Sequence, residues 1–235
     1  MIIEEIANER IFIAGHSGMV GSAICRALKN SKINLENKNP LLTPSRKELD
    51  LLDKQAVEKW FKKNKPTVVI IAAAKVGGIV ANNTSPASFL LENIKIQTNI
   101  IESAWLNNTK RLLFLGSSCI YPKFSPQPIK EESLLKGELE STNQWYAIAK
   151  IAGIKLCDAL RIQYGFDCIS LMPTNLYGPN DNYHDTNSHV MAAFIKRFHY
   201  AKQNSLKSVT CWGSGNPLRE FLHVDDLANA ILFVL

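Results

Sequence analysis

Short apolar runs alternate along this chain with longer segments in which apolar residues recur every three or four positions. The short runs are typical of buried strands, and the longer segments are typical of helices that cover a sheet. The predicted strands are Arg10–Ile13, Leu41–Leu42, Val68–Ala72, Leu112–Leu115 and Ile169–Met172. The predicted helices are Met19–Leu28, Asp53–Asn64, Pro86–Asn107, Trp145–Tyr164, Val190–Lys202 and Asp225–Leu235. This alternation predicts an α/β fold with a doubly wound parallel sheet.

The regular pattern loosens after Met172. Residues 173–188 are rich in Asn, Asp, Pro and Gly, which predicts a loop. We therefore expect a first domain over residues 1–172 and a smaller region over residues 173–235. The last helix stops at Leu235 in an apolar run without a C-cap or a polar ending, so we expect that region to be truncated at its C-terminus.

Composition narrows the class of protein. The 235 residues are 46% hydrophobic and 20% charged, as in an ordinary globular protein. The net charge of +6 indicates either a lysine-rich surface or a field that attracts phosphates. The Lys and Arg residues are scattered, which argues against nucleic acid as a partner.

The cysteines and the apolar runs bear on the compartment. Five widely spaced cysteines, with no C-x-x-C pair, argue against a disulfide framework or a metal site and favour a reducing compartment. The N-terminus has no signal-peptide pattern, and the longest apolar run, Val68–Ala74, is too short to span a bilayer. We expect a cytoplasmic protein without a membrane partner.

A glycine triplet follows the first predicted strand and opens the first helix. Gly15 permits the tight turn, Gly18 lets the backbone approach a pyrophosphate, and Gly21 lets the helix pack closely on the strand. The helix N-terminus would present unpaired N–H groups to the anion. An ordinary glycine turn is the alternative, but the position inside a β-α-β pattern favours a dinucleotide-binding Rossmann domain.

The residues after the second predicted strand bear on the choice of cofactor. An NAD-binding domain usually carries a carboxylate here, whereas this chain has Leu42-Thr-Pro-Ser-Arg46, with no carboxylate. The Arg46 guanidinium could bind a 2′-phosphate through two hydrogen bonds, or Arg46 could be a surface residue. We expect a preference for NADP(H).

Two further segments carry candidate chemistry. Tyr146 and Lys150 lie four residues apart on one predicted helix, hence on one face, and the ammonium is expected to lower the phenol pKa below its usual value of about 10. Ser117 and Ser118 follow a predicted strand at the sheet edge where ligands bind. A Y-x-x-x-K pair alone is common, and the serines alone could be turn residues. A glycine loop, a strand-end serine and a Y-x-x-x-K pair that follow one another in this order are together much more specific than any one of these motifs alone.

With these motifs in place, the chain resembles the extended short-chain dehydrogenase/reductase family, and within it the epimerase-reductases of GDP-linked sugars. The resemblance runs from Arg10 to the end of the chain. Its most specific stretches are Phe12–His16, Ala72–Asn83, Gly116–Pro122, Tyr146–Cys157, Met172–Pro179, Trp212–Gly215 and Arg219–Asp226.

The resemblance implies that GDP-4-keto-6-deoxymannose is epimerised at C3 and C5 and then reduced at C4 by NADPH to GDP-L-fucose. It implies Ser117, Tyr146 and Lys150 for the reduction, and Cys119 and His189 for the proton exchange. A thiol and an imidazole suit the inversion of a sugar carbon, since the carbon loses a proton from one face and gains one on the other. Without the resemblance, Cys119 would be interpreted as a small buried side chain and His189 as a loop residue.

The resemblance also implies binding residues for both ligands, with residues 1–172 as the NADP-binding domain and residues 173–235 as the substrate-binding region. The expected substrate contacts are Arg197, Trp212 and Arg219. The expected cofactor contacts are Gly15, His16, Ser17, Gly18, Met19, Val20, Gly21, Arg46, Leu115, Gly116, Ser117, Ser118, Lys150, Pro173, Thr174, Asn175, Leu176 and His189.

Two alternatives remain open. One is an NAD-dependent nucleotide-sugar 4-epimerase or dehydratase of the same superfamily, against which Arg46 and the Cys119/His189 pair argue. The other is a non-catalytic NADP-binding module, which the presence of both Tyr146 and Lys150 disfavours. The family's dimers also imply a homodimer that forms through the predicted helices 86–107 and 145–164.

Overall fold

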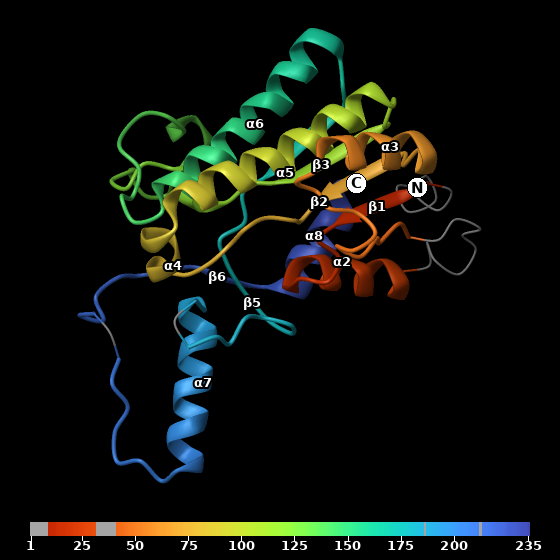
Figure 1. The fold of residues 1–235 in the computed structure, drawn as a ribbon. Coiled ribbons are helices and arrows are strands. Elements are labelled where there is room, and N and C mark those ends of the chain that lie inside the picture. Colours follow the sequence, from red (N-terminus) through yellow and green to blue (C-terminus); the bar gives the residue numbers. More distant parts are fainter. Residues whose placement is uncertain (1–8, 32–40, 186, 212) are drawn as a thin grey trace.

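Four apolar strands form a parallel sheet among the residues that the computed structural model describes, which are 9–31, 41–185, 187–211 and 213–235. The strands are β1 (Ile11–Ala14), β2 (Val68–Ile71), β3 (Arg111–Leu115) and β4 (Cys168–Leu171), in the order β1-β2-β3-β4. Leu42 adds a parallel bridge on the free side of β1, where Ile13 N donates to Leu42 O at 3.1 Å. Four of the five predicted strands are therefore found, while the fifth, Leu41–Leu42, is reduced to this bridge. The predicted fold class is confirmed (Figure 1).

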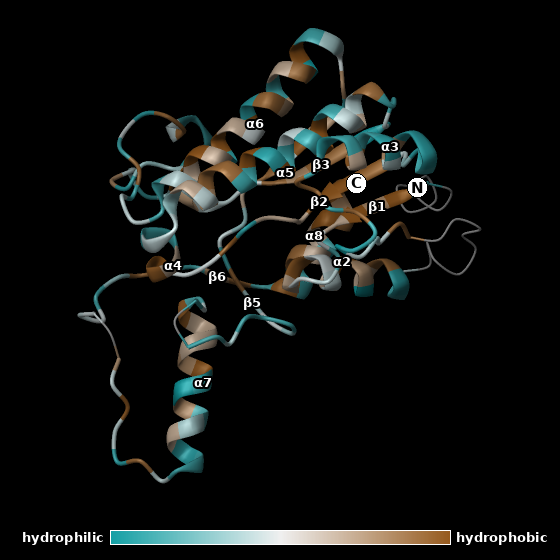
Figure 2. Ribbon diagram, in the orientation of Figure 1, coloured by the Kyte–Doolittle hydropathy of each residue, from teal (hydrophilic) through white to brown (hydrophobic). Residues whose placement is uncertain are grey.

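Residues along each strand alternate between two hydrophobic cores, one on each face of the sheet. Phe12, Val69 and Phe114 face the core under α3 (Lys54–Asn64), α5 (Pro86–Leu106) and α6 (Gln144–Tyr164). Ile13 and Ile70 face the core under α2 (Met19–Asn30) and α8 (Val224–Val234). Figure 1 shows these two helical layers on opposite faces, and Figure 2 shows the hydrophobic strands between them.

The helices begin and end close to their predicted bounds, and local chemistry accounts for several ends. Asp53 accepts a hydrogen bond from Ala56 N at 3.1 Å and caps α3, Pro86 opens α5, and Gly165 closes α6 with φ 68°. The helices are α2 (Met19–Asn30), α3 (Lys54–Asn64), α4 (Ile79–Thr84), α5 (Pro86–Leu106), α6 (Gln144–Tyr164), α7 (Val190–Gln203) and α8 (Val224–Val234). Two 3₁₀ turns add η2 (Ser118–Ile120) and η3 (Glu131–Ser133).

A second, two-stranded parallel sheet lies at the carboxyl end of the main sheet. It pairs β5 (Asn175–Tyr177) with β6 (Phe221–His223). The sequence predicted a loop where β5 forms, so that part of the prediction is wrong. After β5, helix α7 projects away from the sheet, and α8 then returns to pack on α2 (Figure 1). In the part of the chain that the structure describes, no helix is long and apolar enough to cross a bilayer.

Candidate active site

The glycine loop after β1 has the geometry that the sequence predicts. Gly15 has φ 85°, and a Cβ there would lie 2.7 Å from the backbone nitrogen of Ala73. A Cβ on Gly21 would overlap the carbonyl of Gly15, so the first turn of α2 can pack this closely only with glycine at that position. A Cβ on Gly18 would meet only the Gly15 oxygen at 3.5 Å, so the space beside Gly18 is open.

The start of α2 has the properties of an anion site. Its N-cap residue, Gly18, has no side chain to bond the first amides, and the first turn carries no acidic residue. His16 and Ser17 precede the helix, and Met19 and Val20 form its first turn. The open space and the uncapped amides fit the pyrophosphate of a dinucleotide.

Arg46 lies on a tight turn beside this loop. The Glu48 carboxylate accepts a hydrogen bond from Ser45 N at 2.7 Å, and Glu48 N donates to Ser45 O at 3.0 Å. Hydrogen bonds from Ser45 hold the pKa of Glu48 below its usual value, and the nearby His16 acts in the same direction. The Glu48 carboxylate is thus engaged within the turn, while Arg46 is exposed.

Lys150 is the most deeply buried of the candidate catalytic residues. It is 4% exposed, and its ammonium donates to the carbonyl of Leu115, the last residue of β3, at 2.7 Å. Its Nζ lies 4.8 Å from the ring centroid of Phe114 and 5.7 Å from that of Tyr146. Tyr146 and Lys150 therefore share one face of α6, as predicted.

The predicted effect of Lys150 on Tyr146 is wrong. Burial raises the pKa of Tyr146 above its usual value, and the neighbouring Cys119 acts in the same direction. Burial also lowers the pKa of Lys150, to about 8, which Cys119 partly opposes. The cost of placing a phenolate away from water outweighs the attraction of an ammonium that is bonded to Leu115.

Ser117 and Cys119 complete a cluster with this pair. Ser117 directly precedes η2, and its Oγ accepts a hydrogen bond from Cys119 N at 3.4 Å. Burial raises the pKa of the Cys119 thiol, against the opposing effects of Ser117 and the Lys150 charge. Because α6 packs on η2, serine, thiol, phenol and ammonium gather at the carboxyl end of β3.

The segments around the cluster are joined by backbone hydrogen bonds. Gly116 N donates to Leu171 O at 2.8 Å, and Ser118 N donates to Pro173 O at 3.0 Å. Thr174 Oγ1 and Asn175 Nδ2 each donate to the carbonyl of Glu220 at 3.0 Å, and Leu176 follows in β5. The ends of β3 and β4 and the second sheet thus form one connected edge.

His189 lies at the start of α7. It is the N-cap residue, its carbonyl accepts Ala193 N at 2.9 Å, and its side chain is exposed and does not cap the helix. The loop before it contains Asp181. Burial raises the pKa of that carboxyl, against the hydrogen bond from Asn182 N and the charge of His189.

Two of the predicted substrate residues, Arg197 and Arg219, belong to the segment between β5 and β6, and Arg197 lies on α7, which projects from the sheet (Figure 1). The Arg197 guanidinium, on α7, donates to Thr210 O at 3.5 Å. The exposed Arg219 donates to the carbonyl of its neighbour Leu218 at 2.7 Å. Trp212 lies outside the described residues.

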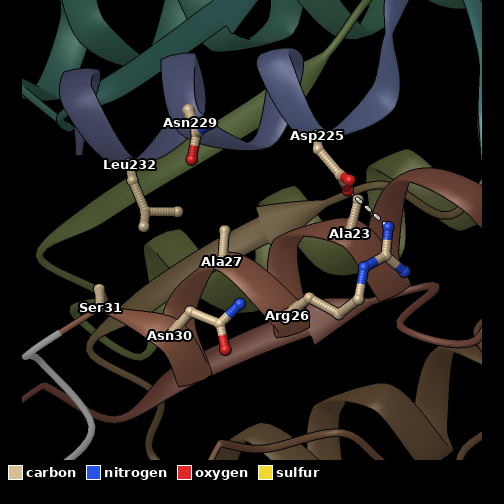
Figure 3. A pocket seen from close by; sticks show the side chains of 8 residues that line it. All are labelled: Ala23, Arg26, Ala27, Asn30, Ser31, Asp225, Asn229 and Leu232. Atoms are coloured by element: carbon tan, nitrogen blue, oxygen red, sulfur yellow. Dashed lines mark hydrogen bonds and ion pairs between the residues drawn. The ribbon is translucent and has the colours of Figure 1, made fainter.

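A cavity of about 470 Å³ lies elsewhere, between α2 and α8 (Figure 3). An ion pair between Arg26 and Asp225, 2.6 Å long, joins the two helices beside it. Its lining consists of Ala23, Arg26, Ala27, Asn30, Ser31, Asp225, Asn229 and Leu232. None of these is a predicted site residue, so the cavity is separate from the cluster.

Two features of the site were missed by reasoning from sequence. Leu115 was predicted as a cofactor contact, but its carbonyl's role as the acceptor for the Lys150 ammonium was not predicted. Two asparagines, Asn82 and Asn93, are buried and bond the backbone that follows β2. Their signal in the sequence was a polar residue on the apolar face of a helix.

Known proteins resemble the chain over nearly its whole length. The profile of a family described as the NAD dependent epimerase/dehydratase family matches residues 11–235. GDP-L-fucose synthase 1 of Arabidopsis thaliana is 60% identical, with 97% of this chain and 69% of that protein covered. GDP-L-fucose synthase of Escherichia coli (strain K12) is 55% identical, with 98% and 70% covered.

A solved structure shows the same resemblance as these sequence relatives. A GDP-L-fucose synthetase from Naegleria fowleri bound to NADP superposes with a TM-score of 0.84 at 31% identity. The comparison covers 97% of this chain and 73% of that one.

Proposed function

The chain belongs to the NAD-dependent epimerase/dehydratase family, and we propose that it is an NADPH-dependent epimerase-reductase that converts GDP-4-dehydro-6-deoxy-D-mannose to GDP-L-fucose. The observation that carries this proposal is the cluster of Ser117, Cys119, Tyr146 and Lys150 at the carboxyl end of β3, the same sheet edge that carries the glycine loop after β1. The cluster combines donors for a ketone oxygen with a thiol that a simple reductase does not need. The synthases that are 60% and 55% identical support the same reaction.

For the reduction, Ser117 and Tyr146 are the donors to the C4 oxygen. The chemistry that NADPH supplies when bound is a hydride for the C4 carbon. Tyr146 holds the proton that the oxygen needs, and its raised pKa keeps that proton in place at neutral pH. Lys150 fixes the position of the helix face through Leu115 and brings a positive charge to the developing alkoxide.

For the epimerisation, Cys119 and His189 remove and return the protons at C3 and C5. Each of these carbons loses a proton to give an enolate, whose oxygen the same donors stabilise. Burial raises the pKa of the Cys119 thiol. Inverting a carbon requires one group on each face, so the thiol and the imidazole act as a pair, one removing the proton and the other returning it.

We assign the cofactor to the glycine loop and to the strand ends that follow it. The amides of residues 15–21 would hold the pyrophosphate, and Arg46 would bind the 2′-phosphate. Residues 115–118 and 173–176, with Lys150 and His189, would hold the nicotinamide half. Residues 1–172 form the cofactor domain, and residues 173–235 contribute substrate contacts through Arg197, Trp212 and Arg219, whose charges and indole suit a nucleoside diphosphate.

We also infer a homodimer that forms through α5 and α6. Ile148, Ala152, Ala159 and Ile162 are exposed and follow one another on α6 at steps of four, seven and three residues, which gives one stripe that is apolar except for Lys155. Ile162 is 85% exposed, and on α5 Leu91 is 53% exposed. Apolar side chains aligned in this way are typical of a helical interface. The five free cysteines suit a cytoplasmic location.

Product analysis tests the proposed reaction. The full-length protein is incubated with GDP-4-dehydro-6-deoxy-D-mannose and NADPH in deuterated water. We expect GDP-L-fucose, one NADPH consumed per product, and deuterium at C3 and C5. The Cys119→Ser and His189→Gln variants should slow deuterium uptake, with a loss of about 100-fold or more for an acid/base group.

The same assay separates the alternative reaction. A nucleotide-sugar 4-epimerase or dehydratase would convert its substrate without net consumption of the nicotinamide cofactor. Conversion with no fall in NADPH absorbance would therefore overturn the proposal. Wild-type exchange rates in both variants would remove the roles of Cys119 and His189 alone.

A further inference from the structure

The backbone that follows β2 is held by two buried amide side chains. Asn93, on α5, accepts a hydrogen bond from Lys75 N at 2.8 Å and donates to Lys75 O at 3.0 Å. Asn82, on α4, donates to the carbonyls of Gly77 at 2.8 Å and Gly78 at 3.1 Å. The asparagines are 2% and 5% exposed, respectively, so this backbone is fixed from within the core.

Gly78 is the point at which this fixed backbone meets the loop that leads to His189. Gly78 N donates to Asn187 O at 3.2 Å. A Cβ on Gly78 would lie 2.8 Å from the carbonyl oxygen of Ser188, closer than real Cβ atoms approach. Its φ of −67° suits any residue, so the reason for glycine here is space rather than conformation.

The other end of the same loop is attached to the cofactor-binding helix. Asn180 Nδ2 donates to Ser22 Oγ, on α2, at 3.0 Å. The loop thus has one contact on α2, through Asn180, and another on Gly78, through Asn187. His189 follows the second contact directly and begins α7. Its position relative to Cys119 therefore depends on how closely Ser188 approaches Gly78.

We propose that Gly78 is a positioning residue for the epimerisation, and that it sets the place of His189 by admitting the backbone of Ser188. This inference rests on the proposed function, since it assigns His189 its acid/base role. A side chain at residue 78 would push the loop outward by several tenths of an ångström or more. Displacements of about 1 Å at a reacting group cost about 100-fold in rate.

The test compares Gly78→Ala with Ile79→Ala in the full-length protein. Ile79 is the next residue and is 66% exposed, so its truncation is a matched control. One measurement is deuterium uptake at C3 and C5. The other is hydride transfer from GDP-L-fucose to NADP⁺, measured at saturating NADP⁺ so that a change in cofactor binding near His189 does not affect the rate. This transfer uses Ser117 and Tyr146 but inverts no carbon.

We expect Gly78→Ala to slow deuterium uptake by about 10- to 100-fold while hydride transfer changes by less than about 3-fold. Ile79→Ala should leave both rates unchanged. In a His189→Gln background, Gly78→Ala should cause little further loss, because the two residues act through one group. Asn82→Ala removes the amide that holds Gly78, and it should slow uptake in the same selective way if Gly78→Ala does not fold.

Two results would overturn the inference. One is uptake at the wild-type rate in Gly78→Ala. The other is an equal fall in both rates, which would show a general loss of structure. A wild-type protein that takes up no deuterium would instead overturn the proposed function itself.

Discussion

Replacing Lys150 with methionine should change how the stability of the protein depends on pH. Burial lowers the pKa of Lys150 from 10.5 to about 8. Between these values the unfolded chain binds a proton that the folded protein does not. Because the unfolded state then binds more protons, the free energy of unfolding rises with pH in this window.

The size of the effect follows from the width of the window. One bound proton corresponds to about 1.4 kcal/mol per pH unit, so wild type should gain about 2 kcal/mol between pH 8 and about pH 9.5. The Lys150→Met variant has no such group and should lack that gain. Below pH 8 the variant is stabilised relative to wild type because it buries no charge. It is destabilised by about 1–3 kcal/mol because the Leu115 carbonyl has lost its hydrogen-bond donor. Near neutral pH these two contributions to the free energy of unfolding largely cancel.

Urea unfolding of both proteins at several pH values measures this difference. Other titrating groups are common to the two proteins and cancel in the comparison. Lys155→Met is the matched control, because Lys155 lies on the same helix with 52% of its side chain exposed and its ammonium stays hydrated. If the difference in the free energy of unfolding between wild type and Lys150→Met stays constant from pH 7 to about pH 9.5, burial does not destabilise the charged form of Lys150 and the argument is refuted.

Three further changes test the cofactor site and the fold. Arg46→Ala should raise the KM for NADPH by about 10- to 150-fold, which corresponds to the free energy of charge-assisted hydrogen bonds, and should change the KM for NADH little. Equal effects on the two KM values would remove the assignment of Arg46 to the 2′-phosphate. Gly21→Ala should lower the free energy of unfolding by about 1–3 kcal/mol in urea, because its Cβ would overlap Gly15, whereas Gly18→Ala should not; equal values would contradict this packing argument. Asp53→Ala should cost about 1 kcal/mol through the lost cap of α3, and an unchanged unfolding midpoint would count against that cap.

The strands and helices of the main sheet could be predicted from sequence because their patterns are local. Val68–Ile71 is a continuous apolar run, and Phe12 and Ile13 face opposite cores, as a strand buried on both faces requires. Strands β5 and β6 could not be predicted, since three residues carry no period and their pairing joins positions 46 residues apart. The contact between Gly78 and Ser188 likewise depends on the tertiary fold.

In the candidate site, the positions of the residues could be predicted from the sequence, whereas their environment could not. The spacing of Tyr146 and Lys150 placed both on one helix face, and the structure agrees. Their pKa values could not be read from spacing, because each depends on which group is buried and which carbonyl the ammonium meets. Lys150 is bonded to Leu115, the final residue of β3, and only the packing of α6 on that strand brings the two together.

The direction of the Tyr146 pKa bears on the chemistry itself. A ketone that accepts hydride becomes an alkoxide and needs a proton, so the useful form of Tyr146 in this direction is the phenol. Burial, which raises its pKa, keeps that form at neutral pH. In the proposed mechanism, the nearby Lys150 ammonium would stabilise the negative charge that develops on the substrate oxygen, and the proton would move from the phenol to that oxygen once the charge has formed. The lysine would then act on the transition state more than on the resting phenol, so its presence and a raised tyrosine pKa are compatible.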